Sequence, residues 1–304
     1  MQTTEVDQEI RTAGQSSSPD LKIPTRRMDF EEAMAELPRH FSAEGDLVSS
    51  HIIASLSSVF PDGEDFFVRS VRHYRSEITD PVLKRQVAGF IGQESMHGRE
   101  HRIFNRRLDE LGYPTLRAER ITRRILKFRE RVLPPVSNLA FTAALEHFTA
   151  TLAELILQDP EVRELMGEQA VRDLFVWHAL EESEHKAVAF DVYKAVGGSE
   201  RLRIFTMKVT RYGFIVGMTI QVLVSLLGDR NTYRKGRLRG SLRAARQNPL
   251  FSRAVWDELC EYDRSGFHPN DRDNTALIAE WREVLFGDEG SLNNLLSNPN
   301  RETA

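Results

Sequence analysis

Two short patterns of glutamate and histidine are the residues of this sequence whose types and spacing could bind metal ions. Each pattern is Glu-x-x-His, first Glu94 with His97 and then Glu182 with His185. Residues three apart on an α-helix project from the same side about one turn apart, so a carboxylate oxygen and an imidazole nitrogen can reach one ion. Both patterns interrupt an apolar helical stripe, where such groups are costly to bury without a partner. A bound cation is the simplest explanation.

A lone glutamate on an apolar helical face precedes each pattern along the chain, Glu64 before the first and Glu146 before the second. One Glu from each of two helices and Glu-x-x-His from each of two others form the ligand set of di-iron and di-manganese carboxylate bundles. Four carboxylates also balance the charge of two divalent ions while the imidazoles stay neutral. Oxygen and nitrogen donors favour iron or manganese, and zinc accepts the same ligands. The sequence therefore predicts two iron ions, with manganese or zinc as alternatives.

The two ions are expected to divide these ligands between them. One set is Glu64, Glu94 and His97, the other is Glu146, Glu182 and His185, and one or two glutamates would bridge. These six residues would also be the catalytic ones. His178 lies one turn before Glu182 on the same face and is expected to be a third imidazole ligand.

Other histidines and glutamates near these patterns receive weaker roles. His101 and His147 are expected to orient the ligating carboxylates rather than to bind metal. Glu154, Glu181 and Glu184 are interpreted as solvated or capping charges. His268 is left outside the metal set.

Helices are the elements that must position these residues. Between Pro and Gly the apolar residues recur every three or four positions, and no stretch alternates as a strand would. Asp80-Pro81 and Asp159-Pro160 are typical of helix starts. The predicted helices cover residues 44–59, 62–78, 81–111, 118–131, 136–158, 161–196, 200–227, 232–246, 249–263 and 273–286. The expected fold class is all-α, a ferritin-like four-helix bundle with additional C-terminal helices.

The domain organisation follows from the same pattern and from composition. We expect a disordered leader over 1–24, a bundle with the dinuclear site over 25–200, a helical extension over 201–290 and a disordered tail over 291–304. The polar leader lacks an apolar signal core, and the single cysteine, Cys260, fits a reducing compartment. The formal net charge of −4 gives no basic excess for nucleic acid. The expected location is cytoplasmic.

An apolar segment in the extension, residues 212–228, carries no formal charge and is followed by a basic stretch from Arg230 to Arg246. Its length is at the lower limit for a membrane span, and a span would place the basic stretch outside, against the positive-inside tendency. Three interpretations stay open: a helix buried over the bundle, a helix at the surface of the inner membrane with arginines on anionic lipid, and the seam of a homodimer.

Several longer motifs carry a resemblance to a known family. The chain resembles the bacterial family described as predicted metal-dependent hydrolases through RRMDFE (26–31), LPRHF (37–41), FPDGEDFFVRSVRHY (60–74), FIGQESMHGREH (90–101), LEHFTA (145–150), WHALEESEHKAVAFDVY (177–193) and GFHP (266–269). Over one helix, the run of His178, Glu182 and His185 also resembles the site of di-iron N-oxygenases that oxidise arylamines. The family resemblance implies metal-dependent hydrolysis.

The ligand set and its apolar surroundings favour a non-haem di-iron oxygenase or oxidase. Such an enzyme activates O2 with electrons from a donor and oxidises a small organic substrate, which the apolar segment predicts to be hydrophobic. The alternative, from the family resemblance, is a hydrolase in which a hydroxide held by two metal ions attacks an ester, amide or phosphoester. A third interpretation, outside enzymes, is iron storage or sequestration.

Overall fold

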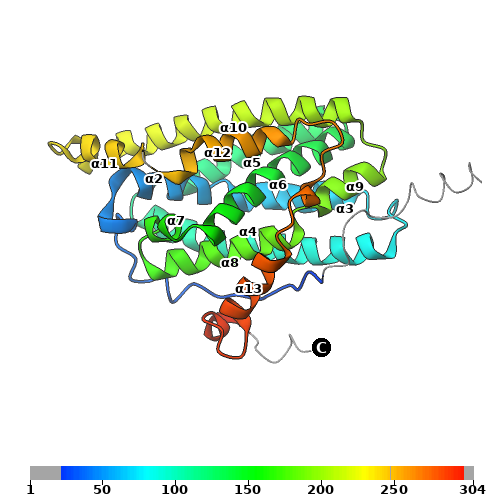
Figure 1. Cartoon of the computed structure of the whole chain (residues 1–304). Helices are drawn as coiled ribbons and strands as arrows, with labels where there is room; N and C mark the ends of the chain where they lie inside the picture. The colour runs from blue at the N-terminus through cyan, green and yellow to red at the C-terminus, as the bar shows by residue number, and fades with distance from the viewer. Residues whose placement is uncertain (1–21, 247, 298–304) are drawn as a thin grey trace, which may run out of the picture.

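The computed structural model describes residues 22–246 and 248–297, and helices are the main regular elements of this part of the chain (Figure 1). The only β-type pairing among these residues is an isolated bridge between Met28 and Leu296. The predicted all-α fold class is confirmed. Most of the buried apolar side chains of the protein form two large clusters. One includes Phe104 and Trp177, and the other includes Phe66.

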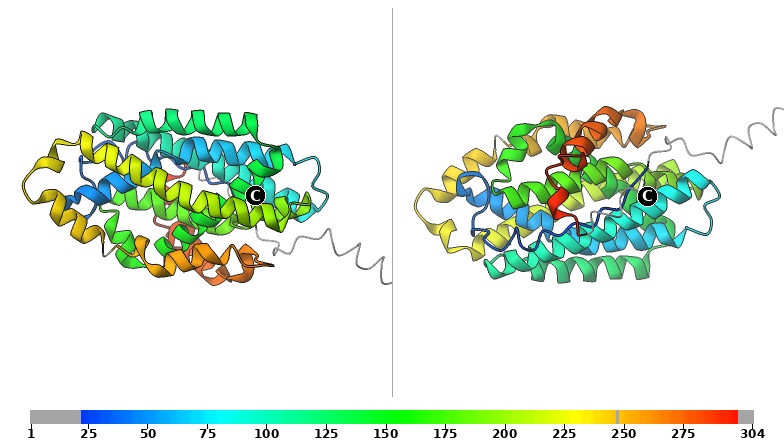
Figure 2. Two further views of the ribbon diagram at one scale, coloured as in Figure 1. Left: turned by 90° about the horizontal axis from the view of Figure 1, so that it is seen from above. Right: turned by 90° about the horizontal axis from the view of Figure 1, so that it is seen from below.

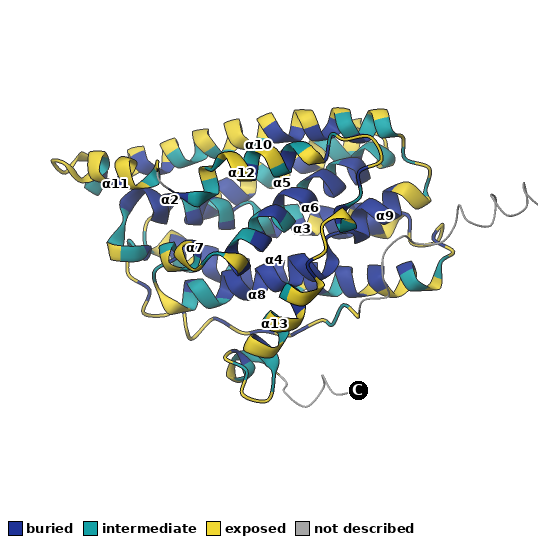
Figure 3. Cartoon of the chain, viewed as in Figure 1, coloured by how far each residue is buried: buried dark blue, intermediate teal, exposed yellow. Residues whose placement is uncertain are grey.

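Four helices carry the predicted metal ligands. They are α3 (Phe60–His73), α4 (Pro81–Glu110), α6 (Pro135–Gln158) and α8 (Gln169–His185). Helix α3 packs against α4 and α6, and α8 packs against the same two partners, so the four helices close a ring around a common centre. All four are buried over much of their length (Figure 3). This ring is the bundle that the sequence predicts; its specifically ferritin-like character stays a prediction.

The remaining helices cover this bundle. Helix α2 (Leu47–Ser57) packs against α4, α5 (Thr115–Val132) against α3 and α4, and α9 (Val188–Ala195) against α6 and α4. Helix α10 (Glu200–Gly228) runs along α6 and α2 on one side of the molecule, where Figure 2 shows it from above. The others are α7 (Pro160–Leu165), α11 (Arg237–Ala245), α12 (Arg253–Glu261) and α13 (Thr275–Phe286), and short 3-10 turns cover Ala43–Gly45, Arg230–Tyr233, Pro249–Phe251, Pro269–Asp271 and Asn293–Leu295.

Two predicted helix starts are confirmed by their capping geometry. The Asp80 carboxylate accepts a hydrogen bond from the Val82 amide at the start of α4, and the Asp159 carboxylate accepts one from the Glu161 amide at the start of α7. In both helices proline occupies the first turn, where no intrahelical amide donor is needed. Local sequence therefore fixes where the ligand-bearing helix α4 begins.

The single helix predicted over 161–196 is wrong, because the chain breaks there into α7, α8 and α9. Gly167 lies between the first two with φ +73°, in the left-handed region that side chains rarely adopt. A Cβ atom at this position would lie 2.1 Å from the Phe41 carbonyl oxygen. The Glu168 amide donates to that same carbonyl. The contact with a distant segment sets the break, which periodicity alone does not reveal.

Both predicted disordered ends extend too far into the chain. The Pro24 carbonyl accepts a hydrogen bond from the Gln93 side chain, so contact with the bundle begins before residue 25. At the other end Leu292 is fully buried and the Leu295 carbonyl accepts from the Asp29 amide. The N-terminal arm and residues 291–297 therefore pack together on the bundle. The rest of the predicted leader and tail lies outside the described residues.

Replacing Gly167 by alanine is expected to destabilise the fold by at least about 2 kcal/mol, because the new Cβ would meet backbone as well as strain φ. Chemical denaturation of the purified variant measures this. Gly197 is the matched control, since its φ is +77° but nothing lies within 4 Å of a built Cβ. Gly197→Ala is expected to cost about 1 kcal/mol. Equal losses in both variants would contradict the role given to the Phe41 contact.

Candidate metal centre

The seven predicted metal ligands come together at the centre of the bundle, and all are buried. Their donor atoms form two groups, within each of which every atom lies within 4.8 Å of the others. The first group is Glu64, His97 and His178; the second is Glu94, Glu146, Glu182 and His185. The third imidazole, from His178, therefore lies in a group with Glu64 and His97.

Glu182 lies between the two groups. Its Oε1 atom is 2.9 Å from His178 Nε2 and 3.6 Å from His97 Nδ1, while its Oε2 atom is 3.6 Å from His185 Nε2. Glu94 is placed similarly, with Oε1 at 3.0 Å from His185 Nε2 and 3.9 Å from His97 Nδ1. The sequence analysis placed Glu94 with Glu64 and His97 and expected one or two glutamates to bridge, whereas the structure groups Glu94 with His185. Each of the two Glu-x-x-His glutamates therefore faces histidines of both groups and could bind an ion in either one.

Most of the donor atoms have the property expected of metal ligands, because they face one another without hydrogen-bond partners; His178 Nε2 and Glu182 Oε1, 2.9 Å apart, are the exception. Buried side-chain atoms that lack a partner among the described residues include both oxygens of Glu64, Glu94 and Glu146, as well as Glu182 Oε2, His97 Nδ1 and His185 Nε2. An unsatisfied buried polar atom costs about 1–3 kcal/mol, and more if it is charged. A cluster of this size therefore fits two cations of the kind that accept oxygen and nitrogen ligands.

Electrostatics in the polypeptide alone points the same way. Burial first, and then neighbouring carboxylates, raise the pKa of Glu64, Glu94 and Glu146 well above the ordinary value. Burial also acts to raise the pKa of Glu182, but His185 and His178 hold it well below that value. Burial lowers the pKa of His97 and keeps that imidazole neutral. Divalent cations between these groups would replace carboxylate repulsion by attraction.

Hydrogen bonds on the outer side of each Glu-x-x-His histidine orient its ring. His97 Nε2 lies 3.0 Å from Glu181 Oε2, so the opposite nitrogen, Nδ1, faces the glutamates. His185 Nδ1 lies 2.8 Å from Gln93 Oε1, and an amide oxygen can only accept, so Nδ1 carries the proton. Burial acts to lower the pKa of His185, but Glu182 and Glu146 raise it to about 9, so Nε2, which faces Glu94 at 3.0 Å, would lose its proton when it binds metal. Such outer partners fix the tautomer and orientation of metal-ligating histidines.

Arg26 joins these two outer partners into one network. Its guanidinium donates to Glu181 at 3.0 Å and to both oxygens of Glu184, at 2.9 and 2.8 Å. Glu184 also accepts from Arg282 and from Gln93, which contacts His185. Burial raises the pKa of Glu181 to about 8 and Arg26 opposes that rise, so a cation on His97 would favour the ionised carboxylate.

The interpretation of Glu181, Glu184 and Glu154 as solvated or capping charges is wrong. Glu181 and Glu184 are buried and pair with arginine, while Glu154 is buried and pairs with Arg272. A helical stripe assigns a residue to one face, but it does not show that a distant N-terminal arm covers the opposite face. The RRMDFE motif contains the arginine that forms this network.

A second chain of hydrogen bonds determines the tautomer of His178. The Ser57 hydroxyl donates to Asn105, so its oxygen accepts from His101 Nδ1 at 2.9 Å. His101 Nε2 then accepts from His178 Nδ1, at 2.8 Å. Burial lowers the pKa of His101, which favours its neutral form. The lone pair of His178 Nε2 therefore points toward Glu64 and Glu182, as a ligand requires.

The two remaining histidines singled out in the sequence serve other contacts. His147 Nε2 lies 3.1 Å from the Glu258 carbonyl, and its ring packs against Tyr262 and Phe267. The expected orienting role of His147 therefore differs from the structure, because that nitrogen contacts backbone on α12 rather than a carboxylate ligand. His268 Nε2 lies 2.8 Å from Asp191 Oδ1, in keeping with its omission from the metal set.

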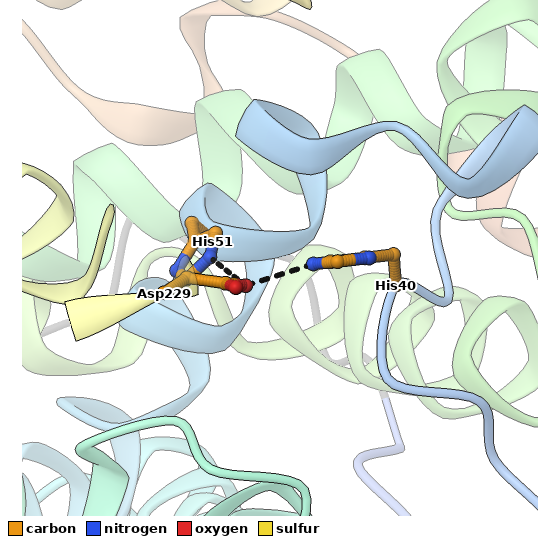
Figure 4. A group of neighbouring side chains, drawn as sticks. All are labelled: His40, His51 and Asp229. Carbon is orange, nitrogen blue, oxygen red and sulfur yellow. Dashed lines mark hydrogen bonds and ion pairs between the residues drawn. The ribbon is translucent and has the colours of Figure 1, made fainter. Parts of the chain in front are cut away.

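A third group of side chains of the types that bind metals consists of His40, His51 and Asp229 (Figure 4). Hydrogen bonds join its members to one another. Asp229 Oδ2 lies 2.8 Å from His40 Nε2 and 3.2 Å from His51 Nε2. The other ring nitrogens contact Arg237 and Ser225, respectively. Every donor atom here has a partner, in contrast to most donor atoms of the central cluster. This group joins the end of α10 to α2 and to the segment before it.

A cavity of about 850 Å³ reaches the central cluster from one side. Glu64, His178 and Glu182 form part of its wall, and the rest is mostly apolar and comes from α3, α5, α6, α8 and α10. Some residues of its wall on α5 and α10, such as Ile125 and Ile220, are also exposed to solvent. The cavity therefore opens on the molecular surface between these two helices.

The comparisons with known proteins place the chain in a family. Residues 24–273 match the model of the family described as predicted metal-dependent hydrolase, so the chain belongs to this family. The match covers every helix that carries a predicted ligand. No curated protein and no solved structure matches the chain. The family description and the clustered metal-type side chains therefore support a metal-dependent enzyme, described for the family as a hydrolase.

Replacing Arg26 by alanine is expected to weaken metal binding by about 10- to 100-fold, because Glu181, which contacts His97, loses its cation and Glu184 keeps only Arg282. Titration of the metal-free protein with ferrous ion under anaerobic conditions measures this. Arg27→Ala is the matched control, since Arg27 is the exposed neighbour. Unchanged affinity in Arg26→Ala, with normal helical content, would show that the network does not orient the ligands.

Proposed function

We propose that the seven clustered residues hold two metal ions, iron by preference, and that the centre oxidises a hydrophobic organic substrate with O2. The observation that carries this proposal is the convergence of buried carboxylate and imidazole atoms that lack other partners. Four glutamates and three histidines in a helical bundle form an oxygen-rich, sulfur-free donor set, which suits iron or manganese. The ligands and the bundle were both expected from the sequence.

Two iron ions bound here would supply the electrons and Lewis acidity for oxygen activation. Inserting one oxygen atom of O2 into a C–H bond forms an alcohol and leaves the second atom as water. This balance needs two further electrons and two protons, so a separate electron donor is part of the proposal. The polypeptide positions the ions, keeps His97 and His101 neutral by burial, and excludes water with an apolar wall.

The side from which substrate approaches is defined by the cavity. Glu64, His178 and Glu182 line it, whereas the cavity wall does not include Glu146 or His185. A substrate in the cavity would therefore meet the ion held by Glu64 and His178 first. The volume and apolar lining of the cavity suit a chain-like acid, alcohol or aldehyde. Iron storage alone would not require such a cavity.

Hydrolysis is the second candidate, and the family description favours it over oxidation. Two metal ions bridged by Glu182 and Glu94 could equally polarise an ester, amide or phosphoester and lower the pKa of water. The substrate would still enter through the apolar cavity. Oxidation is placed first because the donor set has four carboxylates, unlike hydrolytic zinc sites with three protein ligands and an open water position.

Oxygen consumption separates the two candidates. The ferrous protein, prepared anaerobically, is mixed with O2, a reductant and a medium-chain acid, alcohol or aldehyde, while an oxygen electrode and mass spectrometry follow the reaction. Oxidation predicts substrate-dependent oxygen uptake and incorporation of label from ¹⁸O2 into the product. Turnover of chromogenic esters that persists without oxygen and with zinc, together with no oxygen uptake, would select hydrolysis.

A substitution at the cavity mouth tests the entry route. Gly217 lies on α10 in the cavity wall, and a built Cβ meets nothing within 4 Å. Gly217→Trp is therefore expected to fill the cavity without unfolding the helix and to lower kcat/KM for a long-chain substrate by about tenfold or more. Metal content should not change.

Gly228→Trp is the matched control, because Gly228 also lies on α10 with open space around it but not in the cavity wall. Equal activity of the two tryptophan variants would show that substrate does not enter between α5 and α10.

A further inference from the structure

Helix α10 exposes an apolar face that the fold leaves uncovered. Two of the described helices, α6 and α10, are long and apolar enough to cross a membrane, but α6 is 72% buried over its apolar window and α10 only 22%. Helix α6 is therefore a core helix of the bundle, whereas α10 presents its side chains outward. The exposed apolar residues of α10 are Phe205, Val209, Tyr212, Ile215, Val216, Ile220, Leu223, Val224 and Leu227.

Helix α5 continues this surface on the other side of the cavity mouth. Its exposed apolar residues are Ile121, Ile125, Phe128 and Val132, and Phe128 is 67% exposed. Ile121 and Ile125 line the same cavity that α10 lines from its own side. Figure 2, seen from above, shows both helices on this face of the molecule. A contiguous apolar surface of this extent marks an interaction site. We name it the α5/α10 face.

Positive charge surrounds the α5/α10 face although the whole chain is acidic, with a formal net charge of −4. The exposed basic residues of α5 are Arg117, Arg120, Arg123, Arg124, Lys127 and Arg131. Beyond the far end of α10 the exposed cations are Arg230, Arg234, Lys235, Arg237, Arg239, Arg243 and Arg246. Residues 212–228 of α10 carry no formal charge. An apolar centre with a cationic margin is complementary to an anionic lipid surface.

We infer that the α5/α10 face docks on the surface of an anionic lipid bilayer, with its apolar side chains in the outer acyl region and its cations among the headgroups. Helix α10 lies in the plane of that surface and does not cross the membrane, because its other side is fixed to the bundle. Thr210 and Leu226 are buried, Gln221 donates to the Ser55 carbonyl, and Arg211 pairs with Asp263.

A second copy of the chain fits this face less well than lipid does. In a two-fold symmetric dimer the same patch is used by both subunits, so the basic residues of α5 and those beyond α10 would lie near other positive charges. Like charges across an interface are unfavourable. Anionic headgroups supply the opposite charge along the same margin. Charge complementarity therefore selects the bilayer as the occupant.

Docking would also define how substrate arrives, a part of the inference that rests on the proposed function. The cavity mouth lies between α5 and α10, so on a docked molecule it opens toward the acyl chains. A single-chain amphiphile could then enter tail first without passing through water. Burial of apolar surface favours such a transfer by about 25 cal/mol per Å². The substrate class becomes a membrane-resident fatty acid, alcohol or aldehyde.

Co-sedimentation with lipid vesicles tests docking without any measurement of activity. The full chain is mixed with vesicles of phosphatidylcholine alone and of phosphatidylcholine with phosphatidylglycerol. We expect binding to the mixed vesicles that weakens with salt. Val216→Asp/Leu223→Asp changes exposed residues outside the cavity wall and is expected to weaken binding by about tenfold or more.

Two further variants complete the design. Val284→Asp is the matched control, because Val284 is also an exposed apolar residue but lies on α13, on the opposite side of the molecule from α10 (Figure 1). It is expected to bind like the unaltered chain. Reversing Arg120, Arg124 and Lys127 to glutamate is expected to weaken binding to the mixed vesicles by about a hundredfold.

Several results would overturn the inference. The first is that the chain binds neither kind of vesicle. The second is that Val216→Asp/Leu223→Asp folds normally and binds vesicles as well as the unaltered chain. The third is that the unaltered chain binds no vesicles but forms a dimer in solution, which the double variant dissociates. Glu182→Ala separates docking from catalysis, because this variant should lose metal yet still bind vesicles. If the unaltered chain binds vesicles but neither oxidises nor hydrolyses a substrate, the proposed function is rejected while the membrane-binding site stands.

Discussion

The cost of burying charge at the centre of the bundle is the constraint on which the rest of this structure depends. Four glutamates and three histidines meet where helices α3, α4, α6 and α8 pack together. Without cations, burial and mutual repulsion raise the pKa of three of these carboxyl groups. An ion pair or hydrogen bond for each group would solve this locally, as it does around Asp229. Here the donor atoms face one another instead, which is an arrangement suited to two shared cations.

The elements around the bundle serve that centre in two different ways. On one side the N-terminal arm and α13 bring Arg26 and Arg282 to Glu181 and Glu184, and these carboxylates hold the histidine ligands through direct or amide-mediated hydrogen bonds. On the other side α5 and α10 leave an apolar cavity open to the surface. The centre therefore has a rigid polar support behind it and an apolar approach in front, which suits chemistry on a hydrophobic substrate.

The sequence was sufficient to predict the helical fold class and which residues gather at the centre, because both depend on periodicities of three to four residues. It was not sufficient for features set by distant contacts. Gly167 breaks a predicted helix where the Phe41 segment passes, and Glu181 is buried because an arm more than a hundred residues earlier covers it. The division of ligands between two ions also depends on helix rotation in the bundle, which placed Glu94 with His185. The sequence left three interpretations of residues 212–228 open, since an uncharged segment does not reveal its neighbours, and the exposure of α10 contradicts the first of them, a helix buried over the bundle.

Metal stoichiometry tests the central claim most directly. The purified chain and its Glu182→Ala variant are stripped of metal with a chelator, loaded anaerobically with ferrous ion and desalted. Their iron content is then measured by inductively coupled plasma mass spectrometry. Glu164→Ala, at an exposed position, is the control. Two ions per chain in the unaltered protein and in the control, with loss of both in Glu182→Ala, is the predicted result because Glu182 faces both ligand groups. Fewer than two ions in the unaltered chain, or full occupancy in Glu182→Ala, would contradict a dinuclear centre held by these residues.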